Sequence, residues 1–191
     1  MSTTDTTVVQ IPNYVAGTWT IDAVHSDVSF SVRHMMVSKV KGRFGSFEGQ
    51  LVTGANPLES SITATVDLAS IDTNNADRDT HIRSADFFDT EAHQTLTYRS
   101  TGVRRNGHDF VVDGELTLKG ITKPVALDLE VNGFGPDAYG GTRAGFSAST
   151  TISRSDFGVD INLPMDGGGV VIGDKVQIHL EIEAVLATPE A

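Results

Sequence analysis

Apolar and polar side chains alternate with a period of two through most of this chain. In the segment 28–34 (VSFSVRH), every second side chain is apolar until the segment ends at His34. The same alternation recurs in the segments 62–68, 110–118, 125–131, 144–152 and 176–184. Successive side chains of a β-strand point to opposite faces, so this pattern predicts strands that bury one face and expose the other.

Turn-forming residues separate these segments. Asn106-Gly107 predicts a β-hairpin with a type I′ turn, which requires a positive φ at both central residues. The whole chain predicts about eight or nine strands of this kind. Because no strand–helix–strand rhythm appears, we expect an antiparallel sheet in an all-β fold.

The segment 78–89 (RDTHIRSADFFD) interrupts the strand pattern. Residues 75–83 contain no Gly or Pro and few β-branched residues, so a short helix is expected there. Its N-cap candidates are Asp72, Thr73 and Asn74, whose side chains can accept hydrogen bonds from free backbone N–H groups.

Three roles for the segment 78–89 follow from its residues. As a plug, it would close one end of the fold through Phe87 and Phe88. Its charges would then form a tying network in which Arg78 and Arg83 pair with Asp79, Asp86 or Asp89. As a headgroup site, it would bind an anion through Arg78, His81 and Arg83. The third role is catalysis.

Small residues interrupt several inward faces. They are Ala64, Gly114, Ala144 and Ala148, at positions where a filled core would favour larger side chains. One-sided alternation on about eight strands fits either a sandwich or a closed barrel. An eight-stranded barrel is just wide enough to be filled by side chains or to hold one ligand. The small residues favour a cavity, although alternation of small and large residues also fits a tapered, filled barrel.

Composition limits the classes of partner and site. The formal net charge is −11 over 191 residues, which argues against binding to nucleic acid and to anionic membrane surfaces. There is no cysteine, and the six histidines lack the spacing of metal ligands, so we expect no metal and no cofactor. No membrane-spanning segment or signal peptide is recognised, which predicts a cytoplasmic protein.

Catalytic motifs are incomplete in this sequence. GFSAS (145–149) resembles a nucleophile elbow but ends in Ser149 instead of Gly. GGGVVIG (167–173) lacks the Lys of a phosphate-binding loop. His34 ends an apolar face, so it either contacts a ligand headgroup at the barrel mouth or is a hydrogen-bonded edge residue. The single Trp19 is expected in the core.

Six segments in order resemble the YceI-like, polyisoprenoid-binding protein family. They are WTIDAVHSDVSFSVRH (19–34), GRFGSFEG (42–49), RDTHIRSADFFD (78–89), GELTLKGITKPVAL (114–127), RAGFSASTTISRSDFGV (143–159) and GDKVQIHLEIEA (173–184). The resemblance implies an extended antiparallel, eight-stranded, lipocalin-like β-barrel with a short helix closing one end. It also implies an elongated apolar channel for a long isoprenoid or other lipid, and a homodimer.

Combined with the inward-facing pattern, this resemblance predicts the residues of the channel. They are Val28, Phe30, Val32, His34, Ala64, Val66, Phe110, Val112, Leu116, Leu127, Leu129, Phe146, Ala148 and Ile178. The single barrel domain is expected to span 16–187, with tails at 1–15 and 188–191. Carriage or storage of a lipid is the leading hypothesis. The alternatives are an enzyme acting on a lipid or quinone derivative, and an interaction or stress protein that its ligand only stabilises.

Overall fold

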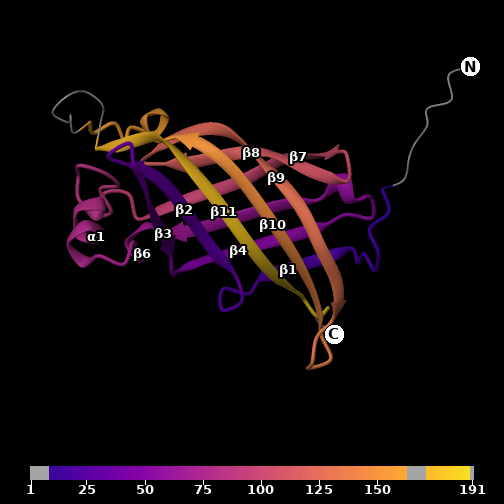
Figure 1. Ribbon diagram of the computed structural model, residues 1–191. Helices are drawn as coiled ribbons and strands as arrows, with labels where there is room; N and C mark the ends of the chain where they lie inside the picture. The colour runs from indigo at the N-terminus through magenta and orange to yellow at the C-terminus, as the bar shows by residue number, and fades with distance from the viewer. Residues whose placement is uncertain (1–8, 163–170, 190–191) are drawn as a thin grey trace, which may run out of the picture.

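The computed structural model describes residues 9–162 and 171–189, and β-strands account for most of them (Figure 1). The strands in these ranges are β1 (Gly17–Ile21), β2 (Asp27–His34), β3 (Ser38–Phe44), β4 (Phe47–Thr53), β5 (Ser61–Asp67), β6 (Ile71–Asp72), β7 (Thr95–Asn106), β8 (Asp109–Leu118), β9 (Ile121–Pro136), β10 (Thr142–Ser153) and β11 (Ile172–Leu186). One α-helix, α1 (Ala76–Arg83), and three short 3₁₀ helices, η1 (Pro57–Glu59), η2 (Leu68–Ser70) and η3 (Arg154–Phe157), complete these elements.

Eight antiparallel strands close into a barrel in the order β1-β4-β5-β7-β8-β9-β10-β11, and pairing between β1 and β11 completes the circuit. The long strand β11 has two partners on one of its edges. Its last residues pair with β1 and its earlier residues pair with β2, which continues the sheet to β3 and β6. The barrel predicted from the sequence is therefore confirmed, and the short strands bring the described total to eleven.

The predicted hairpin at Asn106-Gly107 is present, but its turn is centred one residue later. Asn106 pairs with Asp109, which leaves Gly107 and His108 as the two central residues. Gly107 has a φ of 65°, and His108 does not have a positive φ. A positive φ at the first central residue alone is the pattern of a type II′ turn, so the type I′ expectation was wrong.

Helix α1 lies at one end of the barrel, as predicted (Figure 1). Its N-cap is Asn75, whose side chain accepts a hydrogen bond from the backbone N–H of Arg78 at 2.9 Å. The candidates Asp72 and Thr73 have other roles, since Asp72 instead accepts a hydrogen bond from the backbone N–H of Asn74. The observed N-cap, Asn75, therefore lies one residue after Asn74, the last of the expected N-cap candidates.

Two apolar clusters occupy the interior. The larger one surrounds Leu68, Phe157 and Leu116 towards the α1 end. The smaller one packs Trp19, which is fully buried, against Phe134 and Phe146 at the other end. The indole N–H of Trp19 donates to Thr53 Oγ1 at 2.8 Å, so the predicted core position of this residue is confirmed.

The tail predicted for residues 1–15 lies partly outside the described residues. Within the described part, Ile11 and Tyr14 pack against the smaller cluster. The Tyr14 hydroxyl donates to the carbonyl oxygen of Gly54 at 2.7 Å, and its ring contacts Phe134 edge-on. This segment therefore forms part of the barrel floor at the end opposite α1.

Candidate ligand-binding site

A cavity of about 560 Å³ occupies the barrel interior towards α1. Aliphatic and aromatic side chains from nearly every strand form its wall, because the inward face of each strand is apolar. This volume lies within the range of about 300–1,000 Å³ that is usual for small-molecule sites. The interior can therefore hold an apolar ligand.

A second cavity of about 110 Å³ lies beyond the first, towards Trp19 and Phe134. The two cavities share four wall residues: Ile62, Leu127, Leu180 and Ile182. The aromatic floor of Phe134 and Phe146 limits the second cavity. Together they form two chambers in series along the barrel.

All fourteen residues expected in the channel lie on the wall of one chamber or the other. The larger chamber contains Val28, Phe30, Val32, His34, Ala64, Val66, Leu116, Leu127 and Ile178. The smaller chamber contains Phe110, Val112, Leu127, Leu129, Phe146 and Ala148. Their shared wall position does not by itself identify a ligand.

The four small inward residues have two different effects. Ala64 and Ala148 border the two chambers, so they leave space for a ligand. Gly114 instead makes room for Tyr98, because a Cβ at Gly114 would lie within 2.3 Å of the Tyr98 hydroxyl. Ala144 is packed in the smaller cluster and borders neither chamber. Of the four, Ala64 and Ala148 therefore fit the cavity interpretation, whereas Gly114 and Ala144 fit the alternation of small and large residues in a filled interior.

Tyr98 brings a buried hydroxyl to the chamber wall. This group donates to the carbonyl oxygen of Val125 at 2.9 Å. Burial of the ring, together with the negative charge of Asp113, raises the pKa of Tyr98 to about 12. The hydroxyl therefore stays protonated and fixed at neutral pH, which makes it part of the wall and not a general base.

Charged side chains gather at the α1 end of the larger chamber. Asp77, Arg78 and His81 of α1 lie on its wall, together with Arg154 of η3. The wall is thus apolar along its length and polar at this end. Such an arrangement suits a ligand with a long apolar tail and a polar head.

The three headgroup candidates are placed differently. Arg78 and His81 lie on the chamber wall, whereas Arg83 does not. Arg83 donates from Nε to the carbonyl oxygen of Ala69 at 3.0 Å and from Nη2 to that of Ile71 at 3.3 Å. These bonds tie α1 to η2 and β6. The position of Arg83 favours the tying role, and its headgroup role stays a prediction.

Arg78 is also tied to backbone, through Thr73. Its Nε donates to Thr73 Oγ1 at 2.8 Å, and its Nη2 donates to the Thr73 carbonyl oxygen at 2.7 Å. The buried Asp79 accepts from the backbone N–H and hydroxyl of the same Thr73. Within the described residues, Arg78 and Arg83 have no carboxylate partner within 4 Å, so the expected arginine–carboxylate pairs were wrong. His81 instead contacts Asp86 at 2.8 Å.

His34 and Arg154 complete the polar end. The carbonyl oxygen of His34 accepts a hydrogen bond from the Ser38 hydroxyl, while the His34 side chain lies on the chamber wall. Arg154 is almost fully buried and donates to the carbonyl oxygens of Val159, Gly173 and Ile172 at 2.7–3.1 Å. The sequence pattern did not single out Arg154, although its place two residues after the long alternating segment 144–152 was a usable signal.

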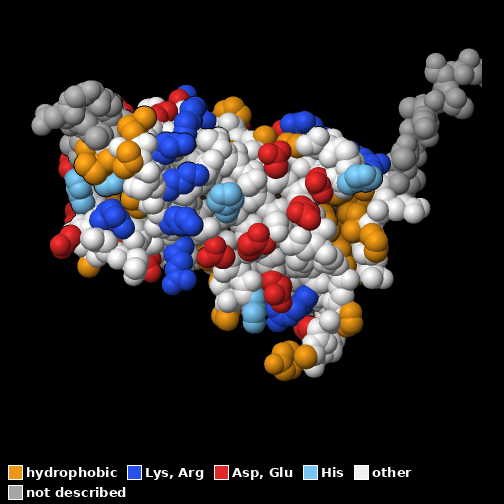
Figure 2. All heavy atoms as spheres, viewed as in Figure 1, with side chains coloured by type: hydrophobic (Ala, Val, Ile, Leu, Met, Phe, Trp, Pro, Cys, Tyr) orange, Lys and Arg blue, Asp and Glu red, His pale blue; other side chains and the backbone are white. Residues whose placement is uncertain are grey.

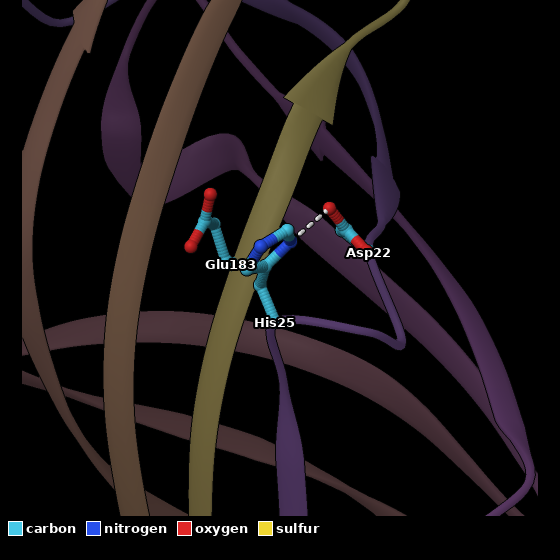
Figure 3. Close-up of side chains that lie close together, drawn as sticks. All are labelled: Asp22, His25 and Glu183. Carbon is cyan, nitrogen blue, oxygen red and sulfur yellow. Dashed lines mark hydrogen bonds and ion pairs between the residues drawn. The ribbon is translucent and has the colours of Figure 1, made fainter. Parts of the chain in front are cut away.

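A second charged group lies at the opposite end, around Arg143 of β10. Figure 3 shows Asp22 and His25, from the β1–β2 loop, beside Glu183 of β11, and their ligand atoms lie within 4.8 Å of one another. Arg143 Nη1 lies 2.8 Å from Asp22 Oδ2 and 2.6 Å from Glu183 Oε1. The guanidinium thus neutralises the two carboxylates that a cation would need, so we assign this group to ion pairing.

This ion-pair group predicts loss of stability in acid. Hydrogen bonds from Arg143 and His25 hold the pKa of Asp22 well below its ordinary value of 3.8. A carboxyl whose folded pKa is depressed stabilises the fold at higher pH, and this contribution is lost as pH falls below the ordinary value. The melting temperature should therefore fall between about pH 4 and pH 2, and Asp22→Asn should flatten that fall. An unchanged pH profile in Asp22→Asn would contradict this assignment.

Comparison with known proteins gives the family. The model of the YceI-like domain matches residues 19–184. A UPF0312 protein of Photorhabdus laumondii is 42% identical over 144 residues, which cover 75% of each chain. The crystal structure of Burkholderia cenocepacia BcnA superposes with a TM-score of 0.75 at 25% identity, covering 88% of this chain and 99% of that one.

A more distant structure shares the fold. It is a polyisoprenoid binding domain from Saccharophagus degradans, with a TM-score of 0.68 at 16% identity, covering 88% of this chain and 98% of that one. The family model covers nearly all of the barrel, from Trp19 in β1 to Ala184 in β11. The chain therefore belongs to the YceI-like family.

Proposed function

We propose that the protein binds a long isoprenoid, such as a polyprenol, polyprenyl phosphate or isoprenoid quinone, in the barrel interior and carries or stores it. The observation that supports this most directly is the pair of apolar chambers in series, the larger of about 560 Å³. The polyisoprenoid binding domain from Saccharophagus degradans has the same fold and adds support.

Physical arguments favour a branched, apolar tail. Each buried CH₂ contributes about 0.8 kcal/mol, so a five-carbon isoprene unit contributes about 4 kcal/mol before the costs of association. Apolar burial has no direction, so the shape of the chambers would select the chain. The head would lie at the α1 end, near Arg78, His81 and Arg154, where a phosphate could accept hydrogen bonds.

The protein as purified should contain a stoichiometric isoprenoid. Organic extraction followed by mass spectrometry would detect it, and the α1-end arginines lead us to expect a phosphorylated or otherwise polar head. A bound straight-chain fatty acid alone would contradict the isoprenoid class. An empty barrel that turns over a lipid or quinone substrate would support an enzyme instead.

No helix within residues 9–162 and 171–189 is both long enough and apolar enough to cross a bilayer. The cytoplasmic location and the homodimer both stay predictions. Cell fractionation and sedimentation analysis would test them separately from lipid binding.

A further inference from the structure

The turn between β2 and β3 exposes three consecutive apolar side chains. Met35 is 44% exposed, Met36 53% and Val37 86%. Turn positions usually carry Gly, Asn, Asp or Ser, because these residues tolerate the backbone conformation and interact with water. Here Met35 and Met36 have φ values of 52° and 62°, in the left-handed region that few residues other than Gly, Asn and Asp adopt. Folding stability alone therefore does not explain this apolar turn.

A column of basic side chains runs back from the turn across the outer face of β2, β3 and β11. We name it the basic stripe; it consists of Arg33, Lys39, Lys41, Arg43 and Lys175, all exposed. The antiparallel register places Arg33 opposite Lys39, and Ser29 and Ser31 opposite Arg43 and Lys41. Figure 2 shows this gathering of Lys and Arg over β2 and β3, with hydrophobic side chains beside it towards the α1 end.

Few carboxylates neutralise the basic stripe. Within the described parts of the chain, Arg43 alone of the five has a carboxylate within 4 Å, that of Asp72 at 3.7 Å. The chain as a whole has 25 acidic residues and a net charge of −11. The surface charge along the basic stripe is therefore opposite in sign to the net charge of the chain. The Debye length is about 8 Å at physiological ionic strength, so a surface in contact with the stripe experiences mainly these cations.

The apolar turn also adjoins the larger chamber. His34, directly before the turn, lies on the chamber wall, and so does its strand partner Ile172. The backbone N–H of Met35 donates to the carbonyl oxygen of Val171, a further wall residue, at 2.8 Å. The turn, the basic stripe and the polar end of the chamber therefore occupy one end of the molecule.

We propose that this end docks on an anionic lipid bilayer, with Met35, Met36 and Val37 inserted at the headgroup boundary and the basic stripe held against acidic headgroups. Exposed apolar side chains beside Lys and Arg are the combination that binds such interfaces, and each basic residue near the surface strengthens binding. Nucleic acid would use the stripe but not the apolar turn. Docking in this orientation sets the polar end of the chamber against the membrane.

The test uses vesicles of equal parts phosphatidylcholine and phosphatidylglycerol, and vesicles of phosphatidylcholine alone, in a co-sedimentation assay. The wild-type chain should bind the mixed vesicles at least about tenfold more strongly, and about 1 M NaCl should remove that preference by screening. Lys39→Glu with Lys41→Glu should abolish the preference. Met36→Asn with Val37→Ser should weaken binding to vesicles both with and without the added NaCl. Asn tolerates the φ of 62° at position 36.

Matched controls lie at the opposite end of the barrel. Val24, 87% exposed in the β1–β2 loop, is changed to Ser, and the exposed Arg105 of the β7–β8 hairpin is changed to Glu. Both variants should bind vesicles like the wild type. Because the vesicles contain no isoprenoid, this result does not depend on the proposed function, which lipid extraction tests separately.

Three outcomes would overturn the docking proposal. The first is absence of wild-type binding to mixed vesicles, or equal losses in the control variants. The second is that the chain binds duplex DNA and does not bind vesicles. This DNA binding would require Lys39 and Lys41 and would be unchanged in Met36→Asn/Val37→Ser. The third is a dimer that this turn variant dissociates while vesicle binding stays unchanged, which would make the turn a self-association surface.

Discussion

Ala64→Phe is expected to reduce affinity for a long isoprenoid by at least about hundredfold. Ala64 lies on the wall of the larger chamber, where the added ring would take the place of roughly one isoprene unit. Losing burial of five carbons removes about 4 kcal/mol, which corresponds to more than a hundredfold in Kd. The measurement is titration of delipidated protein with a fluorescent polyprenyl analogue.

Two companion variants sharpen this prediction. Thr63→Phe places the same ring on the exposed outer face of β5 and should leave affinity unchanged. Ala148→Phe fills the smaller chamber, so it should weaken binding of long chains and spare chains short enough to stay in the larger one. Overpacking costs about 1–3 kcal/mol, so thermal unfolding must show that each variant stays folded. Equal affinity in Ala64→Phe and Thr63→Phe would place the ligand outside the barrel.

Phe87→Ala should lower the free energy of unfolding by about 3–5 kcal/mol, the usual cost of removing a buried Phe side chain. Phe87 is 7% exposed, belongs to the larger cluster and contacts the His81 ring edge-on at 5.1 Å. Its loss would remove a buried aromatic that packs beside α1 in the larger cluster. Urea unfolding at neutral pH measures the effect directly.

Arg83→Ala provides the comparison for this second prediction. Its guanidinium is partly exposed and donates to two carbonyl oxygens, so the expected loss is smaller, about 1–2 kcal/mol. Because Arg83 does not border the chamber, the relative affinity of the folded variant for phosphorylated and neutral isoprenoids should be the same as that of the wild type. A selective loss of the phosphorylated lipid without a stability change would make Arg83 a headgroup residue and contradict its structural role.

The cluster in segment 78–89 shows how far the sequence could be interpreted. The helix and its aromatic anchors were predictable, because helix propensity and a run of two Phe residues are local properties. The partners of Arg78 and Arg83 were not predictable from charge. Carboxylates nearby in the sequence suggested ion pairs, whereas the fold brings carbonyl oxygens of Thr73, Ala69 and Ile71 within reach.

Small residues on inward faces gave a similarly mixed result. Their direction was predictable, since side chains alternate along any strand, but their purpose depends on the neighbouring strand. The space beside Gly114 of β8 is occupied by the ring of Tyr98 from the neighbouring strand β7. Ala64 instead faces open space in the larger chamber. Whether a missing side chain creates a cavity or accommodates a neighbour is decided by packing.

The sequence by itself determined the antiparallel all-β class, the inward face of each strand and the short helix, because these follow from side-chain periodicity and helix propensity over a few residues. Its pattern fitted a sandwich as well as a barrel; the family resemblance implied the barrel, and the tertiary pairing of β1 with β11 closes it. Tertiary structure alone decided which distant charges meet. Strand register brings Asp22, Arg143 and Glu183 into one ion-pair group, and it aligns Arg33, Lys39 and Lys41 on one surface of an acidic protein. Net charge is a sum over the chain, whereas an interface responds to the charges within a Debye length of it.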